Sequence, residues 1–127
     1  MKSIILLFVC AFVAVGCKSD KDISPGEVWS AGCVTFGSDD KGYKLSGICC
    51  AYVIVPKISI KSNNSFSSSA TYYTFTGAGF QELPVTIHGK LSEDRKSLDL
   101  SYEVDGKIIT FELSAGGPNM ACLCGCD

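Results

Sequence analysis

The sequence predicts an all-β domain, a small antiparallel barrel or sandwich of seven to nine strands that disulfides staple together. Three observations lead to this prediction. Apolar and polar side chains alternate over short segments bounded by turn residues, which is the pattern of half-buried strands. No stretch after Cys17 combines helical periodicity with helix start and stop signals. The chain also holds 8 cysteines among 127 residues, a density typical of small exported domains.

The first sixteen residues predict an export signal. Lys2 precedes an apolar run over residues 4–15, and Gly16 then stands directly before Cys17. A charged start, a short apolar segment and a small residue are typical of a signal peptide that is cut off. The run is about a dozen residues long, whereas a helix needs about 20 to cross a bilayer. We therefore expect residues 1–16 to be removed and the remainder to form one domain.

The cleavage point resembles the lipobox of bacterial lipoproteins. Residues 14–17 read AVGC, and the resemblance implies that Cys17 becomes a lipidated N-terminus. The next residues, KSDKD at 18–22, are similar to the short acidic stretches of surface-exported lipoproteins in Bacteroidetes. Two or three acyl chains hold a protein at a membrane without any span. We expect residues 17–27 to be a lipidated cysteine and flexible tether, and the protein to sit on the bacterial outer membrane, periplasmic or surface-exposed.

The domain itself is expected to cover residues 28–127 and to begin with a strand within residues 27–36. Residues 43–56, YKLSGICCAYVIVP, are apolar on both faces. This pattern predicts one strand that is covered on both sides or contains a bulge. Residues 57–61, KISIK, predict a further short strand with its two isoleucines on one face.

The serine-rich segment KSNNSFSSSA, residues 61–70, predicts a polar surface loop. Phe66 is its one large apolar residue, and because long surface insertions cost little loop entropy we expect the loop to be dispensable. The remaining segments predict a strand over residues 70–76, a turn at 76–79, strands over 84–91 and 97–104, a hairpin turn at Asp105-Gly106 and a last strand over 107–113. The side chains expected to point inward are Val85, Ile87, Leu91, Leu98, Leu100, Tyr102, Val104, Ile109, Phe111 and Leu113.

Residues 84–113, PVTIHGKLSEDRKSLDLSYEVDGKIITFEL, look like the C-terminal hairpins of the calycin-like, or lipocalin-like, β-barrel lipoproteins of Bacteroidetes. The resemblance implies a β-barrel with a binding role.

Six cysteines remain after the lipidated one, an even number that predicts disulfides in an exported chain. Neighbouring cysteines on one strand face lie ~6.5 Å apart with parallel Cβ vectors, so bridges within the tail are unfavourable. We expect the tail to pair with the other three, with irregular backbone at Gly47, Gly125 or Gly116-Gly117-Pro118. The alternatives are a zinc or copper site on Cys122, Cys124 and Cys126, and a redox or acylated role. The disulfide candidates are Cys33, Cys49, Cys50, Cys122, Cys124 and Cys126.

The function that these features favour is binding and not catalysis. His88 is the single histidine and is expected on an outward polar face, so we expect no catalytic residue and no cofactor. The net charge of −2 comes without a basic cluster, which argues against nucleic acid. We expect a lipid-anchored module for an apolar small ligand or a partner protein, with Trp29, Phe66 and Tyr72 as contact candidates. The alternative is a thiolate-based zinc- or copper-binding lipoprotein.

Overall fold

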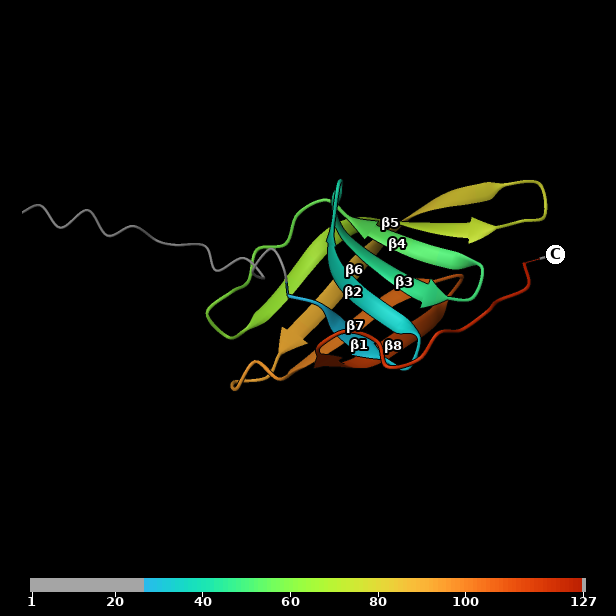
Figure 1. The fold of residues 1–127 in the computed structure, drawn as a ribbon. Helices are drawn as coiled ribbons and strands as arrows, with labels where there is room; N and C mark the ends of the chain where they lie inside the picture. The colour runs from blue at the N-terminus through green and yellow to red at the C-terminus, as the bar shows by residue number, and fades with distance from the viewer. Residues whose placement is uncertain (1–26, 127) are drawn as a thin grey trace, which may run out of the picture.

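The computed structural model describes residues 27–126, which form a closed antiparallel barrel whose strands follow one another in chain order (Figure 1). The prediction of an all-β fold with seven to nine strands is confirmed. The export signal, Cys17 and the tether up to residue 26 lie outside the described residues. The strands are β1 (Trp29–Ala31), β2 (Val34–Asp39), β3 (Gly42–Ile48), β4 (Ala51–Val55), β5 (Ser65–Phe75), β6 (Phe80–Leu91), β7 (Ser97–Val104) and β8 (Lys107–Ala115).

The apolar segment 43–56 is a hairpin and not one strand. β3 ends at Ile48, β4 begins at Ala51, and the two cysteines between them make the turn. Cys50 adopts the left-handed backbone that this turn requires, at φ 60°. The sequence does not reveal this turn, because neither of the two turn residues is glycine or asparagine, the residues that favour positive φ. The apolar residues on both faces belong to two strands that each bury one side.

The expected irregularity at Gly47 is confirmed. The β3–β4 register shifts between Leu45 and Ile48, which marks a bulge. Gly47 has φ 79° and lies against the backbone carbonyl of Cys33, where a side chain has no room. Glycine therefore meets two demands at once here, a positive φ and a close approach of the backbone of a neighbouring turn.

The serine-rich segment is a strand over most of its length, so the expected loop is wrong. Only residues 61–64 form a turn, closed by a hydrogen bond of 3.0 Å from Asn64 N to Lys61 O. β5 then begins at Ser65 and pairs with β6 without a break as far as Phe75. Phe66 is 2% exposed, inside the core. Eleven consecutive cross-strand pairs and the burial of Phe66 override the weak strand preference of serine.

Three further expectations need correction. Residues 27–36 contain two strands, β1 and the start of β2, with a turn at Gly32-Cys33. Residues 57–61 do not form a strand, although Ile58 is buried in the core. The cysteine tail, residues 117–126, has no regular strand. Residues 57–61 are held in place by the burial of Ile58 and the tail by disulfides, not by strand pairing. The spacing of apolar residues does not distinguish these cases from a strand.

The barrel interior is a packed core and not a wide ligand cavity. All the predicted inward residues of β6, β7 and β8 are buried or pack against that core. The fully buried members come from every strand, which is how a small eight-stranded barrel fills itself with side chains. They are Trp29, Phe36, Leu45, Val53, Val55, Ile58, Phe66, Ala70, Ile87, Leu91, Leu98, Leu100, Tyr102 and Leu113.

β5 and β6 are longer than their neighbours and form a ribbon that extends past the barrel wall (Figure 1). β4 pairs with β5 only over Thr71–Thr74. β7 pairs with β6 only from Ile87 onward. The first half of β6, Phe80–Thr86, therefore has β5 on one side and no described strand on the other. This separation of β6 from β7 creates the site described next.

Candidate binding groove

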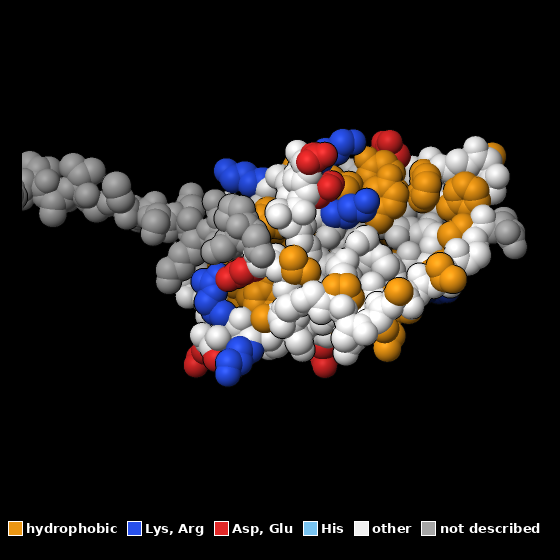
Figure 2. Space-filling view, viewed as in Figure 1, with side chains coloured by type: hydrophobic (Ala, Val, Ile, Leu, Met, Phe, Trp, Pro, Cys, Tyr) orange, Lys and Arg blue, Asp and Glu red, His pale blue; other side chains and the backbone are white. Residues whose placement is uncertain are grey.

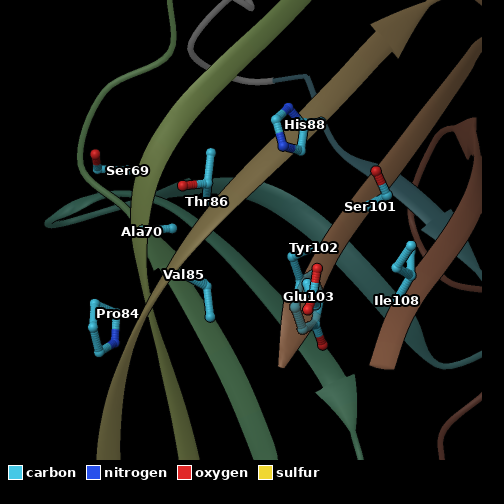
Figure 3. Close-up of a pocket in the computed structure, with 10 residues that line it drawn as sticks. All are labelled: Ser69, Ala70, Pro84, Val85, Thr86, His88, Ser101, Tyr102, Glu103 and Ile108. Carbon is cyan, nitrogen blue, oxygen red and sulfur yellow. The ribbon is translucent and has the colours of Figure 1, made fainter. Parts of the chain in front are cut away.

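A groove of about 560 Å³ lies where β6 and β7 separate (Figure 3). One wall is β6 with adjoining residues of β5, and the other wall is β7 with one residue of β8. The lining combines apolar, hydroxyl and ionisable side chains, as ligand sites commonly do. The lining residues are Ser69, Ala70, Pro84, Val85, Thr86, His88, Ser101, Tyr102, Glu103 and Ile108.

The backbone of β6 directs unpaired polar groups into this groove. Phe75 N donates to Cys50 O on the β4 side (2.8 Å), so the opposite residue Phe80 turns its own N–H and C=O away from β5. The same parity holds at the far end, where Ser92 N donates to Ser97 O across to β7 (3.0 Å). Even-numbered residues of β6 therefore face β7. Among residues 27–126, the N–H and C=O of Glu82 and the N–H of Thr86 have no partner in a neighbouring strand, because the β6–β7 ladder ends at Ile87–Tyr102.

Pro84 lies in the middle of this free edge. It occupies an even-numbered position, so a residue there would direct its N–H into the groove and not toward β5. Proline has no N–H, and it is found in sheets at edges, where no ladder bond is lost. Pro84 is thus consistent with a β6 edge that is open at this point.

Tyr102 lies at the base of the groove with its side chain in the core. The residue is 1% exposed, and within residues 27–126 its buried hydroxyl has no hydrogen-bond partner. Tyr72 and Phe111 pack around it, with ring centroids 5.8 and 6.3 Å from that of Tyr102. Burial, and secondarily the nearby Tyr72, raises the pKa of Tyr102 to about 12. The phenol therefore stays neutral at physiological pH and can donate or accept one hydrogen bond in apolar surroundings.

Besides Tyr102, the ionisable residues that line the groove are His88 and Glu103, and neither lysine nor arginine is among the described lining residues. His88 is on the outer face of β6, as predicted, and also borders a smaller cavity of about 390 Å³ over β6, β7 and β8. The groove is therefore mildly acidic and suits neutral or basic ligands.

Two of the three expected contact residues do not fit an exposed role. Trp29 and Phe66 are 1% and 2% exposed and belong to the core, so the expectation that they face a ligand is wrong. Tyr72 is half-buried and packs against Tyr102 at the base of the groove. Sequence reasoning missed the groove itself because the separation of two strands leaves no local pattern. Proline within the predicted strand 84–91 was the single available signal for an edge.

A second aromatic surface lies outside the barrel on β3 to β6. Tyr52 stacks on Tyr73, its cross-strand neighbour, with centroids 4.6 Å apart and planes 9° apart. Lys44 Nζ lies 4.7 Å from the centroid of the Tyr52 ring, and Phe80 meets the same ring edge-on. Figure 2 shows hydrophobic, basic and acidic side chains gathered over this region. Because these rings contact one another, the cluster stabilises the sheet as cross-strand pairs do.

The tail cysteines form disulfides with the other three, as expected, and the structure decides the connectivity. The bridges join turns to the tail in parallel order, and the Cα atoms of each pair lie 5.7, 5.3 and 5.5 Å apart. These separations are those of ordinary disulfides. The pairs are Cys33–Cys122, Cys49–Cys124 and Cys50–Cys126.

This pairing leaves the thiolate metal site without structural support. Each tail cysteine is bonded to a different partner, so the tail offers no set of three free thiolates. Over residues 27–126, no group of three or more histidine, cysteine or acidic side chains is arranged to hold a metal ion.

Comparisons with protein-family models, curated proteins and solved structures found no match to the chain. No helix in the described range is long and apolar enough to cross a membrane. The groove and its chemistry are therefore the features that indicate a function.

Proposed function

We propose that this protein is a lipid-anchored binding module of the bacterial cell envelope that holds an apolar small ligand or a segment of a partner protein in the groove between β6 and β7. The observation that supports the groove most directly is Tyr102. A buried hydroxyl without a partner costs about 1–3 kcal/mol, and a ligand that satisfies this hydroxyl recovers part of that cost. The lipobox-like AVGC and the polar residues after it support the anchor.

The groove is a better ligand site than the barrel interior, because the interior is packed. An eight-stranded barrel can enclose one small ligand when its interior is left open. Here the interior is filled by side chains from all eight strands. The groove, in contrast, combines volume, apolar side chains such as Val85 and Ile108, and unpaired polar groups.

The proposal is tested by adding probes to the mature chain that carries Cys17→Ser and measuring the NMR chemical shifts of its backbone amides. The probes are an uncharged naphthylamine dye and short apolar peptides. The expected result is that shifts concentrate at residues lining the groove, and that Tyr102→Phe weakens binding without loss of fold. Shifts that are absent from the groove with every probe would contradict the proposed site.

Ile108→Glu and Leu123→Glu form a matched pair for the same titration. Ile108 lines the groove and is 73% exposed, so the change adds a charge there without disturbing the core. Leu123 is a fully exposed residue of the tail and is not among the groove residues. We expect Ile108→Glu to weaken the binding of apolar probes and Leu123→Glu to leave it unchanged. Equal effects of the two substitutions would count against the groove.

A further inference from the structure

We infer that the occupant of the groove is an extended segment of a partner protein that adds to the free edge of β6 as a further strand, apolar at alternate positions and carrying lysine or arginine. This inference rests on the proposed function and names the class of partner. Strand addition of this kind draws its affinity from main-chain hydrogen bonds and its specificity from the alternate side chains.

The first support is the length and polarity of the edge. From Phe80 to Thr86, β6 is hydrogen-bonded to β5 and has no described strand on its other side. By the alternation of an antiparallel ladder, the unpaired groups that face outward there are the N–H and C=O of Phe80 and Glu82, the C=O of Pro84 and the N–H of Thr86. An unpaired edge of this kind is a template for another strand.

The second support is that the opposite wall also carries unpaired backbone. Ser97 O accepts from Ser92 N, so odd-numbered residues of β7 face β6. Glu103 has this parity, and the ladder ends at Ile87–Tyr102 without a Thr86–Glu103 pair, so the C=O of Glu103 does not bond to the N–H of Thr86. An entering strand therefore meets backbone partners along β6 and one carbonyl of β7, that of Glu103, where the groove narrows.

The third support is the chemistry of the side chains. The segment's inward side chains would lie against Val85, with Tyr102 at the base, and its outward side chains would lie near the exposed Ile108. Glu103 in the lining and Glu82 on the free edge are both acidic, and no described lining residue is lysine or arginine. Charge complementarity therefore favours a basic segment over an acidic one.

Pro84 argues against a second copy of this chain as the occupant. If two β6 edges paired antiparallel, each would present a proline without a donor near the centre, and both copies would bring Glu82 to the same interface. Edge prolines and charges are the devices that prevent strands from pairing with themselves. A partner strand of different sequence can choose a register in which it needs no donor from Pro84.

The test uses a short synthetic peptide of alternating valine and lysine, acetylated and amidated, titrated into the Cys17→Ser mature chain. We expect amide shifts at Glu82, Thr86 and Glu103, and slowed hydrogen exchange at Glu82 and Thr86. Two control peptides carry either N-methyl groups on alternate backbone amides or glutamate in place of lysine. Each hydrogen bond lost to N-methylation should weaken binding by about tenfold, and the acidic peptide should also bind more weakly.

Two substitutions in the protein, Thr86→Pro and Thr86→Ala, test the same edge independently of changes to the peptide. Proline removes the N–H that faces the groove and breaks no bond to β5, whereas alanine keeps the N–H. Peptide binding should fall with Thr86→Pro and persist with Thr86→Ala. If Thr86→Pro does not fold, the comparison of N-methylated with unmodified peptide decides the question alone.

The outcomes separate the inference from the function on which it rests. Equal binding of the N-methylated and unmodified peptides in the groove would overturn strand addition and leave the binding groove intact. Concentration-dependent dimers through the β6 edge, with no effect of the peptide, would overturn the choice of occupant. A groove that responds to neither peptide nor dye would overturn both the inference and the proposed function.

Discussion

Tyr102 shows at the scale of one residue how a site can be stable and still incomplete. Its ring fills the core between Tyr72 and Phe111, which contributes to folding, while its hydroxyl has no described partner. Removing an unsatisfied buried hydroxyl usually costs little or nothing. The Tyr102→Phe protein should therefore be as stable as wild type at neutral pH, which keeps any loss of binding interpretable.

The same residue predicts a loss of stability in alkali. Burial raises the folded-state pKa of Tyr102 from 10.0 to about 12. Below pH 10 both the folded and the unfolded chain keep the phenol protonated, so the stability is fully present. Between pH 10 and about 12 the unfolded chain ionises first, and the free energy of unfolding falls by roughly 2–3 kcal/mol. Urea unfolding across this range should show the fall in wild type, and an identical fall in Tyr102→Phe would contradict the assignment.

Gly89 and Phe66 predict a sharp steric effect at one cross-strand pair. The two residues face each other on β6 and β5, and a Cβ on Gly89 would collide with the Phe66 ring. Gly89→Ala should lower the free energy of unfolding by about 1–3 kcal/mol, as overpacking in a core does. Gly117→Ala, where no atom lies within 4 Å of the added carbon, is the matched control. Similar denaturation midpoints for the two variants would show that Phe66 can move aside.

At the scale of elements, the cysteine tail is cross-linked by disulfides to the turns of two hairpins, β1–β2 and β3–β4. Cys33 lies in the β1–β2 turn and the pair Cys49-Cys50 forms the β3–β4 turn, and both turns lie at the same end of the barrel because alternate turns of a meander do. The groove opens toward this end between the other two hairpins, β5–β6 and β7–β8. At this end of the barrel, the β1–β2 and β3–β4 turns are therefore bonded to the tail by disulfides, whereas the β5–β6 and β7–β8 hairpins beside the groove are not.

The order of the three disulfides along the chain predicts that their contributions to the free energy of unfolding are far from additive. Alone, each bridge closes a loop spanning 75 to 89 residues, worth roughly 4 kcal/mol in chain entropy. With Cys49–Cys124 intact, however, Cys50–Cys126 closes a loop of only a few residues, worth about 2 kcal/mol on the same scale.

We therefore expect the double variant Cys50→Ser/Cys126→Ser to lose less than half the stability lost when all six cysteines are replaced by serine. Urea midpoints of the two variants, with free thiols counted in denaturant, provide the measurement. An equal loss from the single bridge would show that Cys50–Cys126 has a role beyond chain entropy, such as holding the left-handed turn.

At the scale of the whole molecule, the entry of the chain and the groove lie at opposite ends. β1 begins at the end away from the β1–β2 turn, whereas Tyr102 and Glu103 lie close to the β7–β8 turn. In the proposed anchored form, the tether would approach the barrel from the membrane side and the groove would face outward. In Figure 1 the β5–β6 hairpin projects at the end of the barrel away from the start of β1.

The lipid anchor is tested by Cys17→Ser in a bacterium that processes lipoproteins. We expect the wild-type protein to partition into the detergent phase and the variant to remain unprocessed or to become soluble, since the acyl chains supply the membrane affinity. Cys33→Ser/Cys122→Ser, which removes one disulfide of the barrel domain and leaves the lipobox-like segment unchanged, is the matched control. Recovery of the Cys17→Ser protein in the detergent phase would rule out this anchor.

The sequence by itself determined the fold class, the last two strands with residues 84–91 of β6, and the kind of pairing that the cysteines make. Those features follow from local patterns: strict alternation in residues 84–113, the Asp105-Gly106 turn, and the directions that neighbouring cysteines take on a chain. Only the tertiary structure decided that KSNNSFSSSA contributes a strand, because Phe66 is buried by residues far away in the sequence. The same holds for the turn at Cys49-Cys50, whose left-handed residue is fixed by two disulfides and not by its own preference. The groove depends on how far β6 continues past its pairing with β7, and that distance is a property of two strands together, which no single segment encodes.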